Sequence, residues 1–430
     1  MWNAAAEAMS REEKTALQTR RLRDVVARVA ARVPFYREGF ARAQVRPDDI
    51  RSLDDLRRLP FTTKNDLRRN YPFGLLAVPR QETVEVHSSS GTTGMPVAVA
   101  YSRGDIDLWS EVMARVVAGA GASSGDVIHN AYGYGLFTGG LGFHYGAMKL
   151  GATVVPASAG ATGRQIKLMQ ELGAKGLVCT PSYALHIAEV MADTQVARDS
   201  LRLEYGVFGA EPWSEGMRRE LEARLGLRAV DVYGLSEVIG PGVASECAEA
   251  QAGLHINDDH FLPEIIDPET GETLPWGARG ELVITTLTKE ALPLVRYRTG
   301  DLTAFLPGDC PCGRTTLRMT RIYGRADNML IIRGANVFPF DIEGVLLSHA
   351  ELEPHYQLVV TREHALDVVE VQVEAKTAYY QGDQLAGIEA RVADAVRKAI
   401  GLGVRVVVVP QRTIPRSEGK ALRVVDRRTA

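Results

Sequence analysis

The sequence predicts an α/β protein with a large N-terminal domain, which combines parallel sheets with a β-rich subdomain, and a small α+β C-terminal domain. At 430 residues the chain is too long for one ordinary core. From about residue 83 to 233, short apolar runs alternate with helical periodicity, as in parallel sheets covered by helices. After residue 260 the pattern becomes β-rich, and beyond Asp327 a βα alternation returns. We therefore expect domains at 1–326 and 327–430.

Periodicity and turn signals place the individual elements. The segment Trp213–Leu225 puts Met217, Leu221 and Leu225 on one face of a helix, which suits packing against a sheet. The turn signal Asp267–Gly271 separates segments of the β-rich part. The other expected elements are strands at Thr83–Val86, Asp126–Asn130, Thr153–Val155, Gly176–Thr180, Val368–Val373 and Val404–Val409, and a helix at Gln384–Ile400.

The composition is typical of a globular protein and argues against nucleic-acid and membrane partners. Apolar residues make up 45% of the chain and charged residues 24%, and the net charge of -3 is close to balanced. The longest aliphatic run, Val406 to Val409, is far shorter than the roughly 20 residues that cross a bilayer. Because Glu7, Arg11 and Glu12 stand where a secretory signal would be basic and then apolar, we expect a cytoplasmic protein.

A polar segment with two glycines follows the strand expected at Thr83–Val86. Glycine lets the backbone approach phosphates with its N–H groups exposed, and Ser and Thr hydroxyls add donors to anionic oxygens. The segment could equally be an ordinary polar surface loop, and it matches neither of the two standard nucleotide fingerprints. The candidate phosphate-binding residues are Ser89, Ser90, Gly91, Thr92, Thr93 and Gly94.

Four short motifs follow this loop in the chain. They are Tyr233-Gly234-Leu235-Ser236-Glu237, Tyr297-Arg298-Thr299-Gly300-Asp301, Gly324-Arg325-Ala326-Asp327 and Gly419-Lys420-Ala421. Together with the loop they resemble the adenylate-forming superfamily of acyl-CoA synthetases. The segments 131–140, 208–213 and 333–339 are similar to its phenylacetate-CoA ligase branch. The resemblance implies an aryl acid-CoA ligase that uses ATP, Mg²⁺ and coenzyme A.

The resemblance also implies a role for several residues at ATP. Adenylation joins two anions, the carboxylate of the acid and the α-phosphate of ATP, so the site needs cations and amide donors. Tyr233 is expected to stack on adenine, although it could simply be a buried aromatic at a strand end. Asp301 and Arg325 match ribose-contacting positions, and Glu237 matches a Mg²⁺ ligand. The other residues expected at the nucleotide are Ala210, Glu211, Pro212, Asp231, Gly234 and Ser236.

The same resemblance implies a mobile C-terminal domain. Lys420 would enter the site during the first half-reaction and stabilise the transition state between carboxylate and α-phosphate. Asp327 matches the hinge, about which the small domain would swing to remove Lys420 and admit coenzyme A. Without the resemblance, the stretch around Lys420 would be an unremarkable exposed tail.

The acid is expected to bind among aromatic and small residues. Aromatic walls and a small floor residue suit a flat ring. Phenylacetate is the substrate that the resemblance implies, while benzoate, anthranilate and hydroxybenzoate fit the same description. The candidate acid-binding residues are Tyr132, Tyr134, Phe137, Phe208 and Gly209.

Three of the four cysteines and one histidine form a candidate metal site. Cys247, His255, Cys310 and Cys312 would make a tetrahedral Cys₃His set. Spacing alone slightly favours unrelated buried thiols, because no Cys-x-x-Cys pair is present. Some proteins that resemble phenylacetate-CoA ligase carry such a site, and we therefore predict a structural zinc ion. Cys179 lies on an expected core strand and reads as a packed apolar residue.

Two alternative functions remain open at the level of sequence. An acid-AMP ligase that loads a carrier protein would have identical adenylation residues. A non-catalytic sensor of nucleotide and aromatic acid would not need both Lys420 and Glu237. The resemblance further implies a homodimer.

Overall fold

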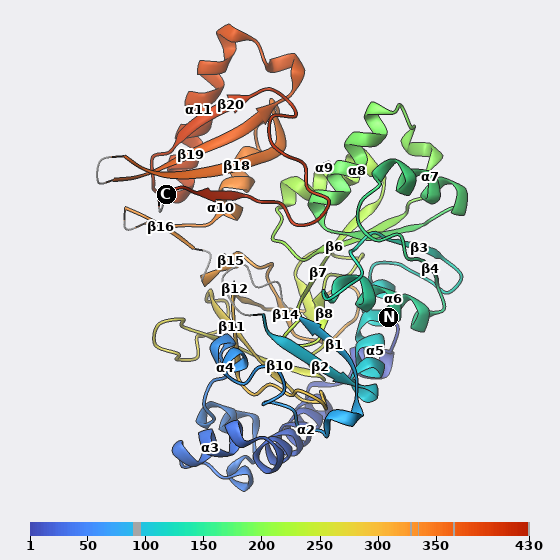
Figure 1. Cartoon of the computed structure of the whole chain (residues 1–430), viewed down its shortest axis with the longest axis vertical. Coiled ribbons are helices and arrows are strands. Elements are labelled where there is room, and N and C mark those ends of the chain that lie inside the picture. Colours follow the sequence, from blue (N-terminus) through green and yellow to red (C-terminus); the bar gives the residue numbers. More distant parts are fainter. Residues whose placement is uncertain (89–95, 327–328, 334, 364–365, 429–430) are drawn as a thin grey trace.

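The computed structural model describes residues 1–88, 96–326, 329–333, 335–363 and 366–428 (Figure 1). A large N-terminal part carries a mixed sheet with helices on both faces, and a small C-terminal part lies beyond it. The predicted α/β class is therefore confirmed. No helix within the described ranges is both long and apolar enough to cross a bilayer. The proposed domain boundary stays a prediction, since residues 327–328 fall outside the description.

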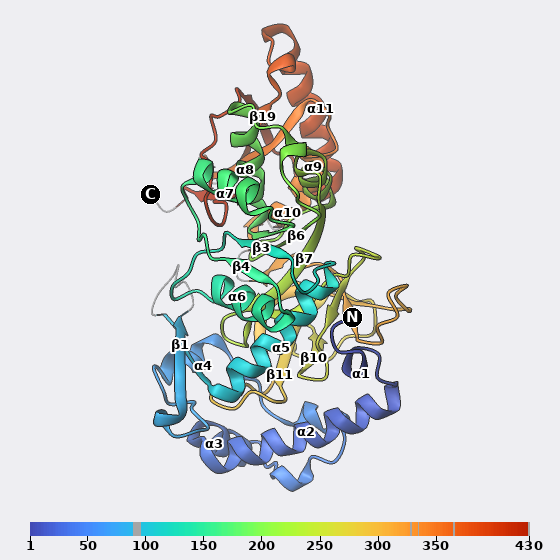
Figure 2. The same ribbon diagram turned by 90° about the vertical axis from the view of Figure 1, so that its right-hand side faces the viewer.

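The chain begins with helices that pack below the main sheet (Figure 2). Ser10 caps the longest of them through a capping box with Glu13, which satisfies backbone groups at its N-terminus. Its apolar face, with Leu22, Val25 and Val26, is completely buried. These helices are α1 (Ala4–Glu7), α2 (Arg11–Arg32), α3 (Pro34–Arg42) and α4 (Lys64–Arg69).

The described residues of the N-terminal part form a nine-stranded sheet in the order β13-β14-β9-β8-β7-β6-β5-β3-β4. The strands from β7 to β4 are parallel and the others are antiparallel. The strand expected at Thr153–Val155 coincides with β4. The strands are β3 (Val127–Asn130), β4 (Thr153–Val155), β5 (Gly176–Cys179), β6 (Tyr205–Gly209), β7 (Arg228–Leu235), β8 (Gly240–Ser245), β9 (Leu254–Ile256), β13 (Phe305–Leu306) and β14 (Arg318–Met319).

Helices cover both faces of this sheet. Residues of α5 (Arg103–Gly119) and α6 (Gly139–Leu150) belong to one core cluster. Residues of α7 (Thr162–Leu172), α8 (Pro181–Asp193) and α9 (Glu215–Leu225) belong to a second cluster on the opposite face. The predicted buried face of α9 is confirmed, because Met217, Leu221 and Leu225 are at most 1% exposed.

The β-rich part predicted after residue 260 is also present. Its four-stranded antiparallel sheet has the order β10-β11-β12-β15. Asp267 forms the predicted turn by accepting hydrogen bonds from the N–H groups of Glu269 and Thr270. The strands are β10 (Phe261–Ile266), β11 (Gly280–Thr286), β12 (Tyr297–Thr303) and β15 (Gly324–Arg325), and a separate hairpin pairs β1 (Thr83–Ser88) with β2 (Ala98–Ser102).

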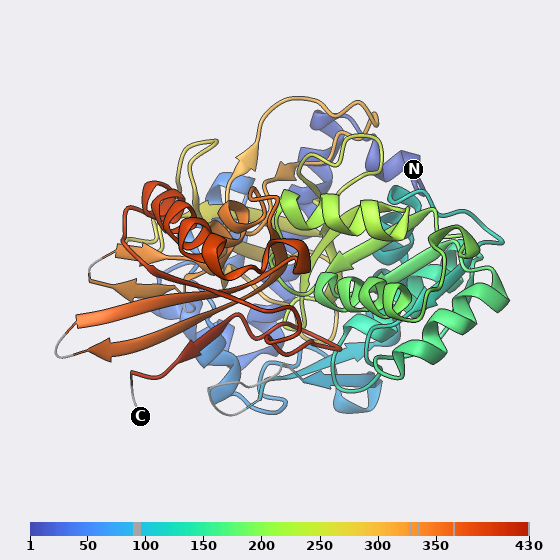
Figure 3. The same cartoon turned by 90° about the horizontal axis from the view of Figure 1, so that it is seen from above.

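The C-terminal part has its own apolar core. A four-stranded sheet in the order β20-β19-β18-β21 packs against α11, and a two-stranded sheet pairs β16 with β17. Figures 1 and 3 show this part beside α8 and α9 of the large part. Its elements are β16 (Leu330–Ile332), β17 (Ala335–Val337), α10 (Pro339–Leu346), β18 (Leu352–Glu363), β19 (Leu366–Ala375), α11 (Gly382–Ile400), β20 (Arg405–Val409) and β21 (Val424–Asp426).

Candidate active site between the two parts of the chain

Several of the motif residues lie where the parallel strands β6 and β7 end. In open α/β sheets, ligands bind outside the carboxyl ends of the strands. Close packing explains the glycines here: a Cβ on Gly209 would lie 2.3 Å from the carbonyl oxygen of Val232, and one on Gly234 would lie 2.0 Å from that of Gly240. Ala210 follows β6 with φ of 72°, a costly conformation for a residue with a side chain and one that clusters at functional sites.

Three predicted nucleotide residues, Tyr233, Asp301 and Arg325, form one hydrogen-bonded group. The hydroxyl of Tyr233, in β7, donates to Oδ2 of Asp301, in β12, at 2.6 Å. Nη1 of Arg325 donates to the other carboxylate oxygen of Asp301 at 3.1 Å, from the directly paired position in β15. Burial, together with the Asp301 carboxylate, raises the pKa of Tyr233 well above its usual value, so the phenol stays protonated. Motifs that are far apart in the sequence thus meet at one place.

The loop that carries Lys420 is fastened to the large part of the chain. The carboxylate of Glu211 accepts a hydrogen bond from the backbone N–H of Ser182 at 2.9 Å and another from that of Ala421 at 2.8 Å. On the other side of Lys420, the hydroxyl of Thr180 donates to the carbonyl oxygen of Gly419 at 2.8 Å. The backbone on both sides of Lys420 is therefore fixed.

The ammonium group of Lys420 lies among charged groups of the large part. The surrounding protein lowers its pKa by desolvation, although the side chain keeps access to solvent. Arg325 lowers this pKa further, while the carboxylates of Glu211, Asp301 and Glu237 oppose the decrease. Lys420 therefore lies near Glu237 and near the group formed by Tyr233, Asp301 and Arg325.

Glu237 has a cationic partner that the sequence analysis missed. Its buried carboxylate lies 3.1 Å from Nζ of Lys64, the first residue of α4. Thr63 caps this helix through a box with Asp66, which fixes where the helix starts. The Thr-x-x-Asp pattern could have predicted the helix start, but it carries no signal that the lysine after the cap would reach Glu237.

The remaining predicted nucleotide residues occupy different surroundings. Ser236 lies with its hydroxyl 3.3 Å from that of Thr138, and Pro212 is exposed after β6. Asp231 is buried in an ion network, 3.6 Å from the guanidinium of Arg321. Burial and the nearby carboxylate of Glu246 raise the pKa of Asp231 to about 8. A contact between Asp231 and the nucleotide stays a prediction.

The aromatic residues Tyr132, Tyr134 and Phe137, which are predicted to bind the acid, follow β3. Tyr132 is buried and stacks on Phe143, with ring centroids 5.2 Å apart and planes at 7°. The hydroxyl of Tyr134 accepts a hydrogen bond from Asn130 at 2.8 Å, which fixes its ring. Phe137 is 55% exposed. Phe137 is the most accessible of the aromatic candidates.

Phe208 is another of the predicted acid-binding residues. Its side chain is completely buried in the core under α8 and α9, with its ring 6.1 Å from that of Trp213. Successive side chains of a strand point to opposite faces, and that of Phe208 points to the face covered by α8 and α9. Phe208 therefore packs in the core, and a contact between it and the acid stays a prediction. The six loop residues Ser89 to Gly94 and the hinge residue Asp327 lie outside the described residues.

The arrangement matches a known protein family. Residues 15–288 match the family model of AMP-binding enzymes, and residues 334–428 match the model of the AMP-binding enzyme C-terminal domain. The chain belongs to the AMP-binding enzyme family. It is 50% identical to phenylacetate-coenzyme A ligase of Thermus thermophilus, over 100% of both chains. It is also 50% identical to phenylacetate-coenzyme A ligase of Escherichia coli, over 98% of this chain and 97% of the relative. The resemblance found in the motifs is confirmed.

Solved structures of another AMP-forming acid ligase indicate which arrangement the two parts adopt. A 2-hydroxyisobutyryl-CoA ligase in its postadenylation state, bound to 2-HIB-AMP, is 29% identical with a TM-score of 0.93. The same enzyme with 2-HIB-AMP and CoA in its thioesterification state is 30% identical with a TM-score of 0.73. Each comparison covers 99% of this chain and 92% of the other. The present chain therefore resembles the postadenylation arrangement.

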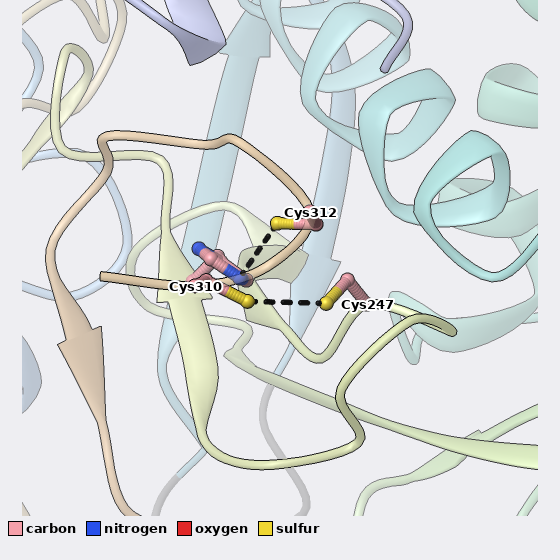
Figure 4. A group of neighbouring side chains, drawn as sticks. Cys247, Cys310 and Cys312 are labelled. Atoms are coloured by element: carbon pink, nitrogen blue, oxygen red, sulfur yellow. Dashed lines mark hydrogen bonds between the residues drawn. The ribbon is translucent and has the colours of Figure 1, made fainter. Parts of the chain in front are cut away.

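This AMP-binding enzyme also brings the predicted metal ligands together (Figure 4). The ligand atoms of Cys247, His255, Cys310 and Cys312 all lie within 4.8 Å of one another. The two sulfurs of Cys247 and Cys310 are 3.6 Å apart, and Sγ of Cys312 is 3.5 Å from Nε2 of His255. A tetrahedral zinc site requires about 3.8 Å between sulfurs and about 3.5 Å between sulfur and nitrogen. These two distances fit such a site.

The surroundings of His255 suit a metal ligand. Its Nδ1 lies 2.9 Å from the hydroxyl of Thr316, so Nε2 is left to face the sulfurs. Burial lowers the pKa of His255 to about 3, with Arg314, Arg318 and Lys14 adding to the decrease. The imidazole is therefore neutral at pH 7, which is the form that binds a metal.

Proposed function

We propose that this chain is an ATP-dependent aryl acid-CoA ligase whose substrate is phenylacetate or a related aromatic acid. The observation that carries the proposal is the position of Lys420. This residue comes from the C-terminal part and lies among Glu211, Asp301, Arg325 and Glu237 of the large part. Full-length identity of 50% to proteins named phenylacetate-coenzyme A ligase supports both the reaction and the acid.

In the first half-reaction, a carboxylate oxygen of the acid attacks the α-phosphorus of ATP, and the bond to pyrophosphate breaks. Negative charge accumulates on the phosphoryl oxygens, where the ammonium of Lys420 would stabilise it. Tyr233 would stack on adenine. Asp301 would hold the ribose, because its carboxylate can accept hydrogen bonds from the ribose hydroxyls. The backbone hydrogen bonds on both sides of Lys420 would limit its freedom before reaction.

Two cations, Mg²⁺ and the ammonium of Lys64, would neutralise the leaving pyrophosphate. Glu237 fits a Mg²⁺ ligand, because this hard cation is often bound by one or two carboxylates together with substrate phosphates. When bound, Mg²⁺ would withdraw charge from the phosphates. Lys64, 3.1 Å from Glu237, would add a second cation from α4. It would compensate for the lysine that the loop at 89–94 lacks.

In the second half-reaction, the thiol sulfur of coenzyme A attacks the acyl carbon. The bond to AMP breaks and the thiol proton passes to solvent. Lys420 has no role in this step, so the C-terminal part would rotate about residue 327 and open the site. The two states of 2-hydroxyisobutyryl-CoA ligase support such a rotation, because the same enzyme matches this chain with a TM-score of 0.93 in one state and 0.73 in the other.

The Cys₃His set supports a structural zinc ion. All four ligand positions come from the protein, which leaves no open position for a substrate. Zinc would tie the turn between β13 and β14 to β9 and to the segment after β8. Its contribution would be to the stability of the β13-β14-β9-β8 edge of the nine-stranded sheet.

A pyrophosphate-release screen tests the proposed function. The purified enzyme, ATP, Mg²⁺ and coenzyme A would be supplied with phenylacetate, benzoate, anthranilate, hydroxybenzoates or an aliphatic acid. We expect phenylacetate to give the highest kcat/KM, at least about tenfold above benzoate, because a missing methylene costs about 1–3 kcal/mol in an apolar pocket. Activity with the aliphatic acid alone would contradict the assignment of an aromatic substrate. A purified carrier protein in place of coenzyme A should give no acylated product.

A further inference from the structure

An ionic contact between the two parts lies close to the Lys420 loop. Glu189, in α8, accepts hydrogen bonds from Nε and Nη2 of Arg416 at 2.7 and 2.9 Å. Nε2 of His355, in β18, lies 2.7 Å from the same carboxylate. One carboxylate of the large part therefore binds two side chains of the C-terminal part. We call Glu189, Arg416 and His355 the interdomain cluster.

The interdomain cluster is largely shielded from solvent. The side chains of Glu189 and Arg416 are 12% and 15% exposed, and that of His355 is 8% exposed. Burial alone would raise the pKa of Glu189, but the neighbouring side chains of His186, His355 and Arg416 outweigh burial and lower it. Glu189 is therefore ionised, and its bidentate hydrogen bonds to Arg416 are of the strong, charge-assisted kind.

The cluster also fixes the start of the loop that carries Lys420. Arg416 precedes Lys420 by four residues. Its Nη1 and Nη2 atoms donate to the buried carboxylate of Glu374, in β19, at 2.7 and 2.9 Å. Arg416 thus bridges the C-terminal sheet and α8 at the same time. Loss of the contact to Glu189 would free the loop from α8 while Arg416 kept its partner within the C-terminal part.

We propose that Glu189 is a positioning residue that stabilises the adenylation arrangement and so sets the balance between the two half-reactions. The inference rests on the proposed function, because it assumes that Lys420 serves only the first half-reaction. The structure resembles the postadenylation state of 2-hydroxyisobutyryl-CoA ligase far more than its thioesterification state. A contact that exists in one arrangement can shift the equilibrium only toward that arrangement.

The same helix offers a matched control. Asp193 lies one turn after Glu189 in α8 and pairs with Arg412, which also belongs to the C-terminal part. The side chains of Asp193 and Arg412 are 47% and 59% exposed. Exposed ion pairs contribute little, because water and salt screen them. Asp193→Asn should therefore leave both half-reactions unchanged.

The test measures the half-reactions separately in Glu189→Gln. We expect phenylacetate-dependent ATP–pyrophosphate exchange without coenzyme A to slow about tenfold or more, as expected for loss of a charged hydrogen bond. Thioester formation from supplied phenylacetyl-adenylate should stay within about twofold of wild type, since this step does not use the lost contact. The variant Glu189→Asp, which keeps the charge, should recover part of the exchange rate.

Two results would overturn the inference. One is a Glu189→Gln enzyme with wild-type exchange, and the other is an equal loss in both half-reactions, as expected for a purely structural role. If Glu189→Gln does not fold, Glu189→Asp decides between the same outcomes. A wild-type enzyme without any exchange would instead contradict the proposed function, so the two failures can be told apart.

Discussion

Replacing Lys420 with alanine is expected to slow acyl-adenylate formation about 100-fold to 1,000-fold, the range found when one preorganised charge-stabilising group is removed. The ammonium lies among Glu211, Asp301, Arg325 and Glu237 of the large part. Thioester formation from supplied phenylacetyl-adenylate should remain within about twofold of wild type, because in the proposed mechanism Lys420 has left the site before this step. Exchange and thioester assays on the same preparation measure the two rates.

A second lysine provides the control for this variant. Lys398 lies in α11 of the same C-terminal part, where it is 72% exposed and pairs with Asp394. Lys398→Ala should leave both half-reactions unchanged. Equal losses in both half-reactions of Lys420→Ala would contradict the assignment of this residue to adenylation alone.

Replacing Cys310 with serine is expected to remove bound zinc and to lower the free energy of unfolding by about 3 kcal/mol or more. Cys310 is buried against Cys247, and its sulfur is one of four ligand atoms that lie within 4.8 Å of one another. Without the ion, the three thiols and Nε2 of His255 would be left to hydrogen-bond with one another. Elemental analysis should give one zinc ion per wild-type chain and none in the variant.

Cys179 separates this effect from the general cost of altering a buried cysteine. It lies in β5, is completely buried, and belongs to the second core cluster. Cys179→Ala should retain one zinc ion per chain, whatever its effect on the melting temperature. A wild-type protein without zinc, or a Cys310→Ser protein that keeps it, would contradict the zinc assignment.

Much of the fold could be predicted because local patterns and the final structure agree. The apolar stripe Met217, Leu221 and Leu225 defined a helix face that is buried, and the strand at Thr153–Val155 was placed at its observed bounds. Such segments are specified by periodicity, which does not depend on distant contacts. The motif residues Tyr233, Asp301 and Arg325 were also expected to share a site, and they do.

Side chains whose environment depends on tertiary packing could not be predicted in the same way. The complete burial of Phe208 could not be predicted, because the face on which a strand residue lies depends on the register of the sheet. Lys64 and Glu189 could not be recognised from the sequence, because each contacts a residue far away in the chain. Lys64 reaches Glu237, and Glu189 reaches Arg416. Neither pairing leaves a local pattern.

The central claim is that distant segments form one adenylation site, which Lys420 completes. ATP–pyrophosphate exchange by the wild-type enzyme with phenylacetate and without coenzyme A tests this claim most directly. We expect rapid exchange that depends on both the acid and Mg²⁺. In the proposed mechanism, acyl-adenylate formation is reversible and does not require coenzyme A. Exchange that is absent until coenzyme A is added, or that proceeds equally well without any acid, would contradict it.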